Sequence, residues 1–241
     1  MGMKISLNPD SVTYLLSAAA AFLIFDSSAA LLLDNLTGYN SLFVHKLVKL
    51  FYVDLELNIP AFFSMLLLLI ASLLLAVITI LKRQENADYV QQWAILSGGF
   101  LFMAFDEVIA VHERLIEPMR AVLGEQHLGV LYFAWVVPVI PLVLFLAFFF
   151  LKFLWSLPEK TKLSFLLAAS LYVGGAIGCE LLESRHCEIY GKENLLYMIQ
   201  TTIEESFEMG GVIVFIWALL TYIAERYEEV RFRFDNAENS L

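Results

Sequence analysis

Acidic side chains interrupt several strongly apolar stretches of this chain, where an ionised carboxylate is energetically expensive. The carboxylates and imidazoles concerned are Asp26, Asp106, Glu107, His112, Glu113, Glu180, Glu183, His186, Glu204, Glu205 and Glu208. No lysine or arginine lies within the same apolar stretches to neutralise them. Because a buried charge costs several kcal/mol unless it is paired or coordinates a metal, these acids require protons or bound metal ions.

The first group of acids follows one face of a predicted helix. Asp106 and Glu113 are seven residues apart, so on an α-helix they project within about 20° of each other. Glu107 and His112 flank this stripe. The spacing predicts that carboxylate and imidazole ligands point in one direction.

Two further helices carry the same ligand types. Glu180, Glu183 and His186 recur at i, i+3 and i+6, which places them within an arc of about 120°. Glu204 and Glu208 stand one turn apart, with Glu205 beside them. Three segments far apart in the sequence therefore offer metal-ligating faces.

Composition assigns the chain to the membrane class. Of the 241 residues 60% are hydrophobic and 17% are charged, and the mean hydropathy is +0.73. Soluble proteins are about 45–50% apolar and about 25% charged. Six apolar runs long enough to cross a bilayer as helices occur at 11–33, 59–81, 90–113, 132–154, 163–183 and 195–224. No basic patch or recognition motif is present, so nucleic acid is not an expected partner.

The predicted fold is all-α, a polytopic membrane protein with a bundle of six transmembrane helices. A single domain is expected at 1–226, followed by a charged cytoplasmic tail at 227–241. Between the first two spans, Phe43, Leu47 and Leu50 repeat at helical spacing opposite Lys46 and Lys49. This pattern predicts an interfacial amphipathic helix.

The basic residues predict the orientation. Nine Lys and Arg fall on the side that holds the N-terminus and six on the other side. By the positive-inside rule both termini are cytoplasmic and the chain is a multi-pass protein of the cell membrane. Asp26, Asp106, Glu180 and Glu208 then lie about 4–8 Å below the non-cytoplasmic boundary, at one shared depth.

A multinuclear metal site near the non-cytoplasmic face is the interpretation that joins these observations. The expected ligands are Asp106, His112, Glu113, Glu180, Glu183, His186, Glu204 and Glu208, with Asp26, Glu107 and Glu205 as bridging or supporting groups. Oxygen-rich coordination with one or two imidazoles suits iron or manganese, and zinc is a further option. More than four carboxylates at one layer indicate two or three ions, because bridging cations remove the repulsion between them.

Two segments carry a resemblance to known proteins. The helix with Asp106-Glu107 and His112-Glu113 resembles a D-E-x4-H-E helix of uncharacterised multi-pass membrane proteins of bacteria, and the segment 54–60 is similar to a feature of such a family. The E-x-x-H spacing of Glu183 and His186 resembles that of ferritin-like di-metal carboxylate proteins. The chain departs from their paired pattern, because Ile109 stands three residues before His112.

Three functions follow from such a site. The first is a membrane metalloprotein that acts as an enzyme or redox protein on a lipid or other apolar substrate, an oxidoreductase with iron or a hydrolase with zinc. The second is a divalent-cation or proton transporter, because intramembrane acids also mark ion pathways. The third is a metal site that only holds the helices together. Membrane lipid and metal ions are the expected partners, and a homo-oligomer is compatible with the sequence.

Overall fold

The computed structural model describes residues 7–37, 41–124, 127–227 and 229–230, and it is helical. Its six helical segments long and apolar enough to cross a membrane are α1 (Pro9–Leu36), α3 (Ile59–Gln84), α4 (Val90–Ile109), α6 (Val136–Ser156), the continuous run Glu159–Tyr190 and α9 (Leu195–Arg226). The run Glu159–Tyr190 comprises α7 (Glu159–Val173), the π-helical segment η3 (Gly174–Cys179) and α8 (Glu180–Tyr190). Shorter elements are α2 (Leu42–Phe51), η1 (Glu113–Leu115), α5 (Ile116–Leu123) and η2 (Gly129–Leu131). The predicted all-α bundle with six candidate spans is therefore confirmed, and it fits a multi-pass membrane protein.

Asparagine caps determine where three of the long helices begin. The side-chain oxygen of Asn8 accepts from the backbone N–H groups of Asp10 and Ser11 at the start of α1. Asn58 and Asn194 cap α3 and α9 in the same way. Such caps satisfy backbone donors that have no partner inside the helix, and each is worth about 1 kcal/mol.

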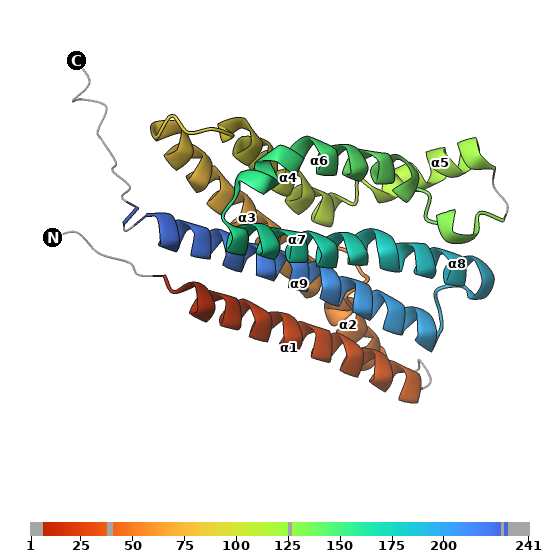
Figure 1. Ribbon diagram of the computed structural model, residues 1–241. Coiled ribbons are helices and arrows are strands. Elements are labelled where there is room, and N and C mark those ends of the chain that lie inside the picture. Colours follow the sequence, from red (N-terminus) through yellow and green to blue (C-terminus); the bar gives the residue numbers. More distant parts are fainter. Residues whose placement is uncertain (1–6, 38–40, 125–126, 228, 231–241) are drawn as a thin grey trace, which may run out of the picture.

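Helix α9 lies at the centre of the bundle (Figure 1). It packs against α1, α3, α7 and η3. Its buried residues Ile216 and Leu219 belong to the same apolar core as Leu67 and Leu75 of α3. The first turn of α1 and the last turn of α9 lie at the same end of the bundle, as an even number of spans requires.

A glycine permits the closest approach between α9 and α7. A Cβ atom on Gly211 would lie 2.8 Å from the backbone nitrogen of Tyr172 and 3.0 Å from the carbonyl oxygen of Ala168. Both atoms are backbone and cannot move without shifting a helix. Small residues at helix contacts are typical of membrane bundles, where van der Waals packing replaces the hydrophobic effect.

The helix expected at 90–113 ends earlier than its apolar pattern indicates. Helix α4 stops at Ile109, because Ala110 adopts a left-handed conformation with φ 48° and ψ 52°. After this residue, Glu113 opens the short 3-10 helix η1. The expectation that Asp106 and Glu113 share one helical face is therefore wrong.

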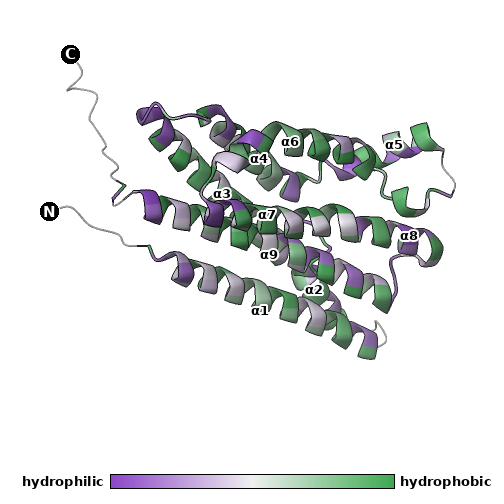
Figure 2. Cartoon of the chain, in the orientation of Figure 1, coloured by the Kyte–Doolittle hydropathy of each residue, from purple (hydrophilic) through white to green (hydrophobic). Residues whose placement is uncertain are grey.

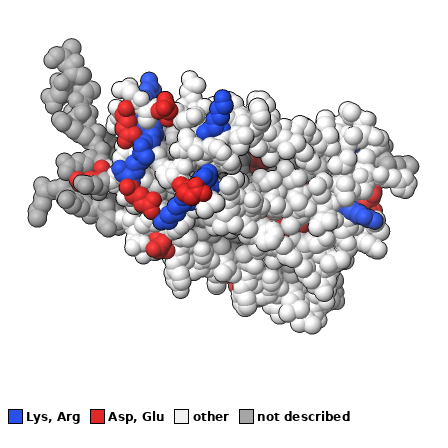
Figure 3. Space-filling view, viewed as in Figure 1, with Lys and Arg blue, Asp and Glu red and all other residues white. Residues whose placement is uncertain are grey.

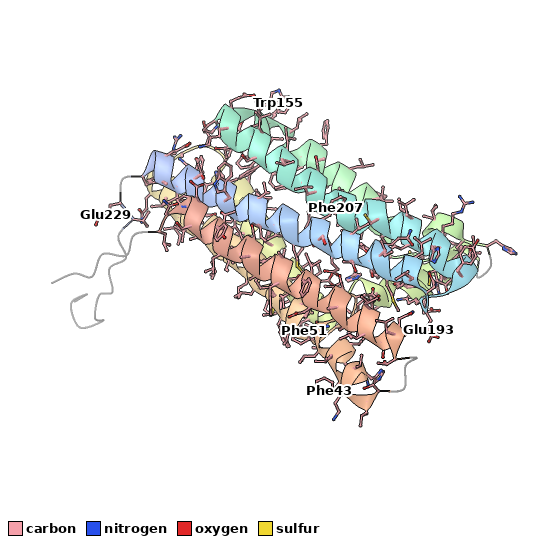
Figure 4. All side chains as sticks on the ribbon, turned by 90° about the horizontal axis from the view of Figure 1, so that it is seen from below. Phe43, Phe51, Trp155, Glu193, Phe207 and Glu229 are labelled. Carbon is pink, nitrogen blue, oxygen red and sulfur yellow. The ribbon has the colours of Figure 1, made fainter. Side chains whose placement is uncertain are left out.

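The distribution of polarity matches the six candidate spans. Hydrophobic residues cover the middle of the long helices, whereas hydrophilic ones gather toward their ends (Figure 2). On the face shown in Figure 3, most charged side chains lie at the end where α1 begins and α9 ends, and the middle is almost free of them. Trp155 marks that end, and Glu193 lies at the opposite end (Figure 4).

Helix α2 follows α1 in the chain and packs against α1 and α3. Its apolar residues Leu42, Phe43 and Leu50 are exposed on the isolated chain, while Val44 is buried. This agrees with the predicted amphipathic helix. Most of the tail predicted at 227–241 lies outside the described residues.

One ion pair at the end that holds the termini yields a stability prediction. Lys82 is buried, and its ammonium donates to Glu85 Oε2 at 2.8 Å. This hydrogen bond lowers the pKa of Glu85 below its ordinary value. A carboxyl with a lowered folded-state pKa stabilises the protein above the ordinary pKa, and this contribution disappears as the pH falls through the lowered value.

We therefore expect Glu85→Gln to cost about 1 kcal/mol at pH 7, a small effect because Glu85 is 39% exposed and water screens the pair. At an acidic pH below the lowered pKa of Glu85, the variant and the unmodified protein should unfold at the same temperature. Thermal unfolding in detergent at both pH values measures this. An equal difference at both pH values would show that Glu85 acts through packing instead of charge.

Candidate metal centre

Three glutamates from two elements meet inside the bundle. One carboxylate oxygen from each of Glu180, Glu183 and Glu204 can be chosen so that all three oxygens lie within 4.8 Å of one another. Glu183 is only 1% exposed, and its Oε1 has no hydrogen-bond partner among the described residues. Three acids at such short range repel one another when ionised, and a shared cation or protons must offset this repulsion. We call these three residues the carboxylate triad.

The π-helical segment η3 directly precedes the first two members of the triad. Glu180 and Glu183 occupy the first turn of α8, and Glu204 lies on α9, which packs against η3. A Cβ atom on Gly175 of η3 would lie 2.9 Å from the carbonyl oxygen of Glu204 and 3.0 Å from Glu208 Cγ. A glycine in a π-helical turn thus lets α9 approach closely enough to bring the acids together. Such turns occur frequently at functional sites.

A tryptophan orients one member of the triad. Trp135 Nε1 donates to Glu180 Oε1 at 2.7 Å. The Trp135 ring also packs edge-on against the His112 ring, with centroids 4.9 Å apart. Trp135 therefore connects the triad to the histidine that follows α4.

His112 and Asp106 form a pair across the turn after α4. His112 Nδ1 lies 2.7 Å from Asp106 Oδ2, and the His112 backbone N–H donates to Asp106 Oδ1 at 3.0 Å. Both oxygens of Asp106 are thus engaged, while His112 Nε2 has no hydrogen bond to a described residue. Burial lowers the pKa of His112, but the hydrogen bond and charge of Asp106 outweigh it, so this pKa lies above its ordinary value. A carboxylate on one ring nitrogen is the usual support for an imidazole that binds metal through the other.

A second group of acids lies next to the triad. Glu208 is within electrostatic range of Glu107, Glu180 and His112. Glu205 is within range of Glu107 and Glu208. A cavity of about 10 Å³, close to the space that one water molecule needs, is lined here by Ser64, Leu67, Leu68, Glu107, Tyr172, Glu208, Met209 and Val212. This group therefore offers room for one further small ligand.

Sequence reasoning missed several polar groups around these acids. Asp54 accepts from the Tyr197 hydroxyl at 3.4 Å, and burial raises the pKa of Asp54 although Lys192 and Tyr197 act in the opposite direction. Burial and the charge of Glu113 raise the pKa of Glu56, which also interacts electrostatically with His112. The sequence feature that could have indicated these groups is the pair Asp54 and Glu56, which lies just before Pro60 at the start of the second span.

Two predicted ligands, His186 and Glu113, and the predicted supporting group Asp26 do not join the acids. His186 Nε2 lies 2.7 Å from Asn194 Oδ1, so His186 holds the cap residue of α9. Glu113 is exposed at the start of η1 and lines a groove outside the triad. Asp26 is half-buried on α1, outside the triad and outside the cavity beside it. The structure brings together Glu180, Glu183 and Glu204 and places Glu107, His112, Glu205 and Glu208 near them.

A helical bundle of six candidate membrane spans with a carboxylate-rich interior defines the class of this protein. Within that class, the chain belongs to the family described as Domain of unknown function (DUF8692), which matches residues 13–223. The match covers both segments in which the sequence resembles uncharacterised membrane proteins, and it offers no support for a relationship to ferritin-like proteins. Neither a curated protein nor a solved structure matches the chain.

The bond between Trp135 and Glu180 yields a prediction on affinity. Trp135→Phe keeps most of the ring but removes the donor to Glu180 Oε1. If the triad holds a metal ion, as the sequence predicts, the affinity for that ion should fall about tenfold. Competition with a metal indicator in detergent measures it. Trp155→Phe is the control, because Trp155 is exposed at the opposite end of the bundle. Equal affinities of both variants would mean that Trp135 does not position Glu180.

Proposed function

We propose that this chain is an integral membrane metalloprotein that holds two metal ions near the non-cytoplasmic face and acts on a lipid or other apolar substrate. The observation that carries the proposal is the carboxylate triad, with oxygens within 4.8 Å and one buried oxygen of Glu183 lacking a hydrogen bond. No lysine or arginine forms an ion pair with these acids among the described residues. A divalent cation would supply the missing partner.

The donor set favours particular ions. The first position has the three carboxylates of the triad. The neighbouring position has His112 with Glu107 and Glu208, so the whole site is rich in oxygen and has one imidazole. This composition suits iron or manganese, with zinc as the next candidate. Iron would supply redox chemistry, and zinc would supply an activated water for hydrolysis.

The chain's own residues have separate roles in this proposal. The triad binds one ion, and Trp135 fixes the direction of Glu180. Asp106 positions His112 through Nδ1 and leaves Nε2 free to bind the second ion. Apolar residues of α3 and α9 beyond the acids exclude water and strengthen the electrostatic interactions.

The distribution of polar residues favours a metalloenzyme over a transporter. On the side of the acids that leads to the termini, the core of α9 continues with Val212, Ile216 and Leu219, which pack with Leu75 and Ile78 of α3. No further acid follows among the buried residues that the structure describes there. An ion pathway requires polar groups through the whole membrane.

Elemental analysis of the purified full-length protein tests the proposal. We expect about two equivalents of iron, manganese or zinc per chain, and a change in reconstituted lipid, detected by mass spectrometry, only with the metal-loaded protein. If the protein still contains no bound metal after incubation with each ion, the proposal is overturned. Cation flux into vesicles that is lost in Glu204→Gln would reassign the site to transport, and bound metal without lipid turnover would reduce it to a structural role.

A further inference from the structure

A groove opens beside the triad, at the end of the bundle opposite the termini. Its volume is about 500 Å³, within the range of small-molecule sites. It is lined by Glu113, Ile116, Glu117, Arg120, Tyr132, Phe133, Cys187, Gly191 and Lys192. These residues come from the segment after α4, the segment before α6 and the end of α8 (Figure 1). The groove thus lies where three candidate spans end, which is the depth of phospholipid headgroups in a bilayer.

Two cations of the groove are held in place by aromatic rings. The Arg120 guanidinium lies 3.9 Å from the centre of the Tyr132 ring, and its Nε donates to the Tyr132 carbonyl at 2.7 Å. The Lys192 ammonium lies 4.9 Å from the centre of the Phe133 ring and 5.6 Å from that of Tyr197. The Lys192 ammonium makes no hydrogen bond or ion pair among the described residues; only its backbone carbonyl accepts, from Asn194 at 3.0 Å. Cations fixed in this way are preorganised for a phosphate.

Two acids balance these cations. Glu117 accepts from Arg120 at 3.3 Å, but its side chain is 83% exposed, so the pair is weak and a ligand can displace it. Glu113 is exposed and has no ion pair among the described residues. A phosphate alone satisfies only the cations, whereas a headgroup with both a phosphate and an ammonium satisfies both signs.

The groove is close to the triad. Cys187 lines the groove and lies one helical turn after Glu183 on α8. Lys192 is within electrostatic range of both Glu180 and Glu183. The backbone N–H of Phe133 donates to Ser184, the residue after Glu183, at 3.0 Å. A molecule seated in the groove therefore rests on the residues that surround the triad.

We infer that this groove binds the headgroup of a membrane phospholipid that carries a phosphate and an ammonium, with the phosphate at Lys192 and Arg120 and the ammonium at Glu113. The inference rests on the proposed function, for which it names the substrate class. The acyl chains remain in the bilayer beside the exposed apolar surface of α4 and α6. The headgroup, and not the chains, selects the lipid.

Lipid retention by the full-length protein, measured by native mass spectrometry from detergent, tests the inference. The probes are phosphatidylethanolamine, phosphatidylglycerol and diacylglycerol, offered in equal amounts. We expect phosphatidylethanolamine to be retained most and diacylglycerol least. Lys192→Gln should weaken retention of both phospholipids about tenfold, whereas Glu113→Gln should weaken only phosphatidylethanolamine. Lys46→Gln is the matched control, because Lys46 is an exposed lysine of α2 outside the groove.

The overturning results are distinct from those for the metal site. Equal retention in Lys192→Gln and Lys46→Gln would show that the groove does not bind the phosphate. A loss of phosphatidylglycerol in Glu113→Gln as large as that of phosphatidylethanolamine would remove the ammonium from the assignment. Displacement of lipid by an equal concentration of soluble glycerophosphoethanolamine would assign the groove to a free headgroup. Metal content is measured on the same samples and should be unchanged in Lys46→Gln. Retention of lipid as expected by a protein that binds no metal would contradict the proposed function alone.

Discussion

Glu183→Gln is expected to remove metal from the triad while making the metal-free protein more stable. Loss of a residue that merely supports a ligand costs about 10–100-fold in metal affinity, so loss of a ligand should exceed about 100-fold. Without metal, the neutral amide also relieves the repulsion that Glu180 and Glu204 exert on a third carboxylate within 4.8 Å. Metal titration and thermal unfolding of the same samples measure the two effects.

The opposite signs of these effects separate a ligand from a structural residue. A variant that only disturbed folding would lose metal and stability together. Glu193→Gln is the control, since Glu193 is an exposed acid at the same end of the bundle. Retained metal in Glu183→Gln would contradict the assignment of Glu183 as a ligand.

Gly175→Ala is expected to have the second largest effect. The new Cβ atom would lie 2.9 Å from the carbonyl oxygen of Glu204, a backbone atom, and 3.2 Å from Phe207 Cβ. Because α9 must move to relieve these contacts, we expect a loss of about 1–3 kcal/mol in stability and a weaker metal site. Thermal unfolding and metal content of the purified variant measure both.

The neighbouring glycine provides the control for this substitution. A Cβ atom on Gly174 would meet no atom within 4 Å, so Gly174→Ala adds a methyl group to the same π-helical segment without a clash. Equal behaviour of the two variants would indicate that alanine acts through the helical segment itself and not through the approach of α9. Metal binding in Gly174→Ala should match that of the unmodified protein.

The six spans could be predicted from sequence because apolar runs of about 20 residues leave few alternatives in a membrane. The end of α4 could not be predicted from the sequence. Ala110 takes a left-handed conformation that usually favours glycine, and it does so where Asp106 accepts hydrogen bonds from the backbone and ring of His112. That turn depends on contacts between side chains and backbone, and it leaves no trace in the hydrophobic periodicity of the sequence.

The proximity of the predicted acids follows from the order of the spans more directly than the position of His186 does. Glu180, Glu183 and Glu204 share a layer because α8 and α9 are adjacent antiparallel segments, which the order of spans implies. The E-x-x-H spacing pointed to His186, but that residue holds Asn194 at the start of α9. Trp135 donates to Glu180 across 45 residues of sequence. Contacts of this kind depend on how helices pack and cannot be read from spacing.

Anomalous scattering from the full-length protein, recorded at the absorption edges of iron, manganese and zinc, tests the metal proposal most directly. We predict one peak coordinated by oxygens of Glu180, Glu183 and Glu204, and a second beside His112 Nε2 and Glu208. No peak at the triad after loading with all three metals would contradict the proposal, because the three carboxylates would then be held together by protons alone.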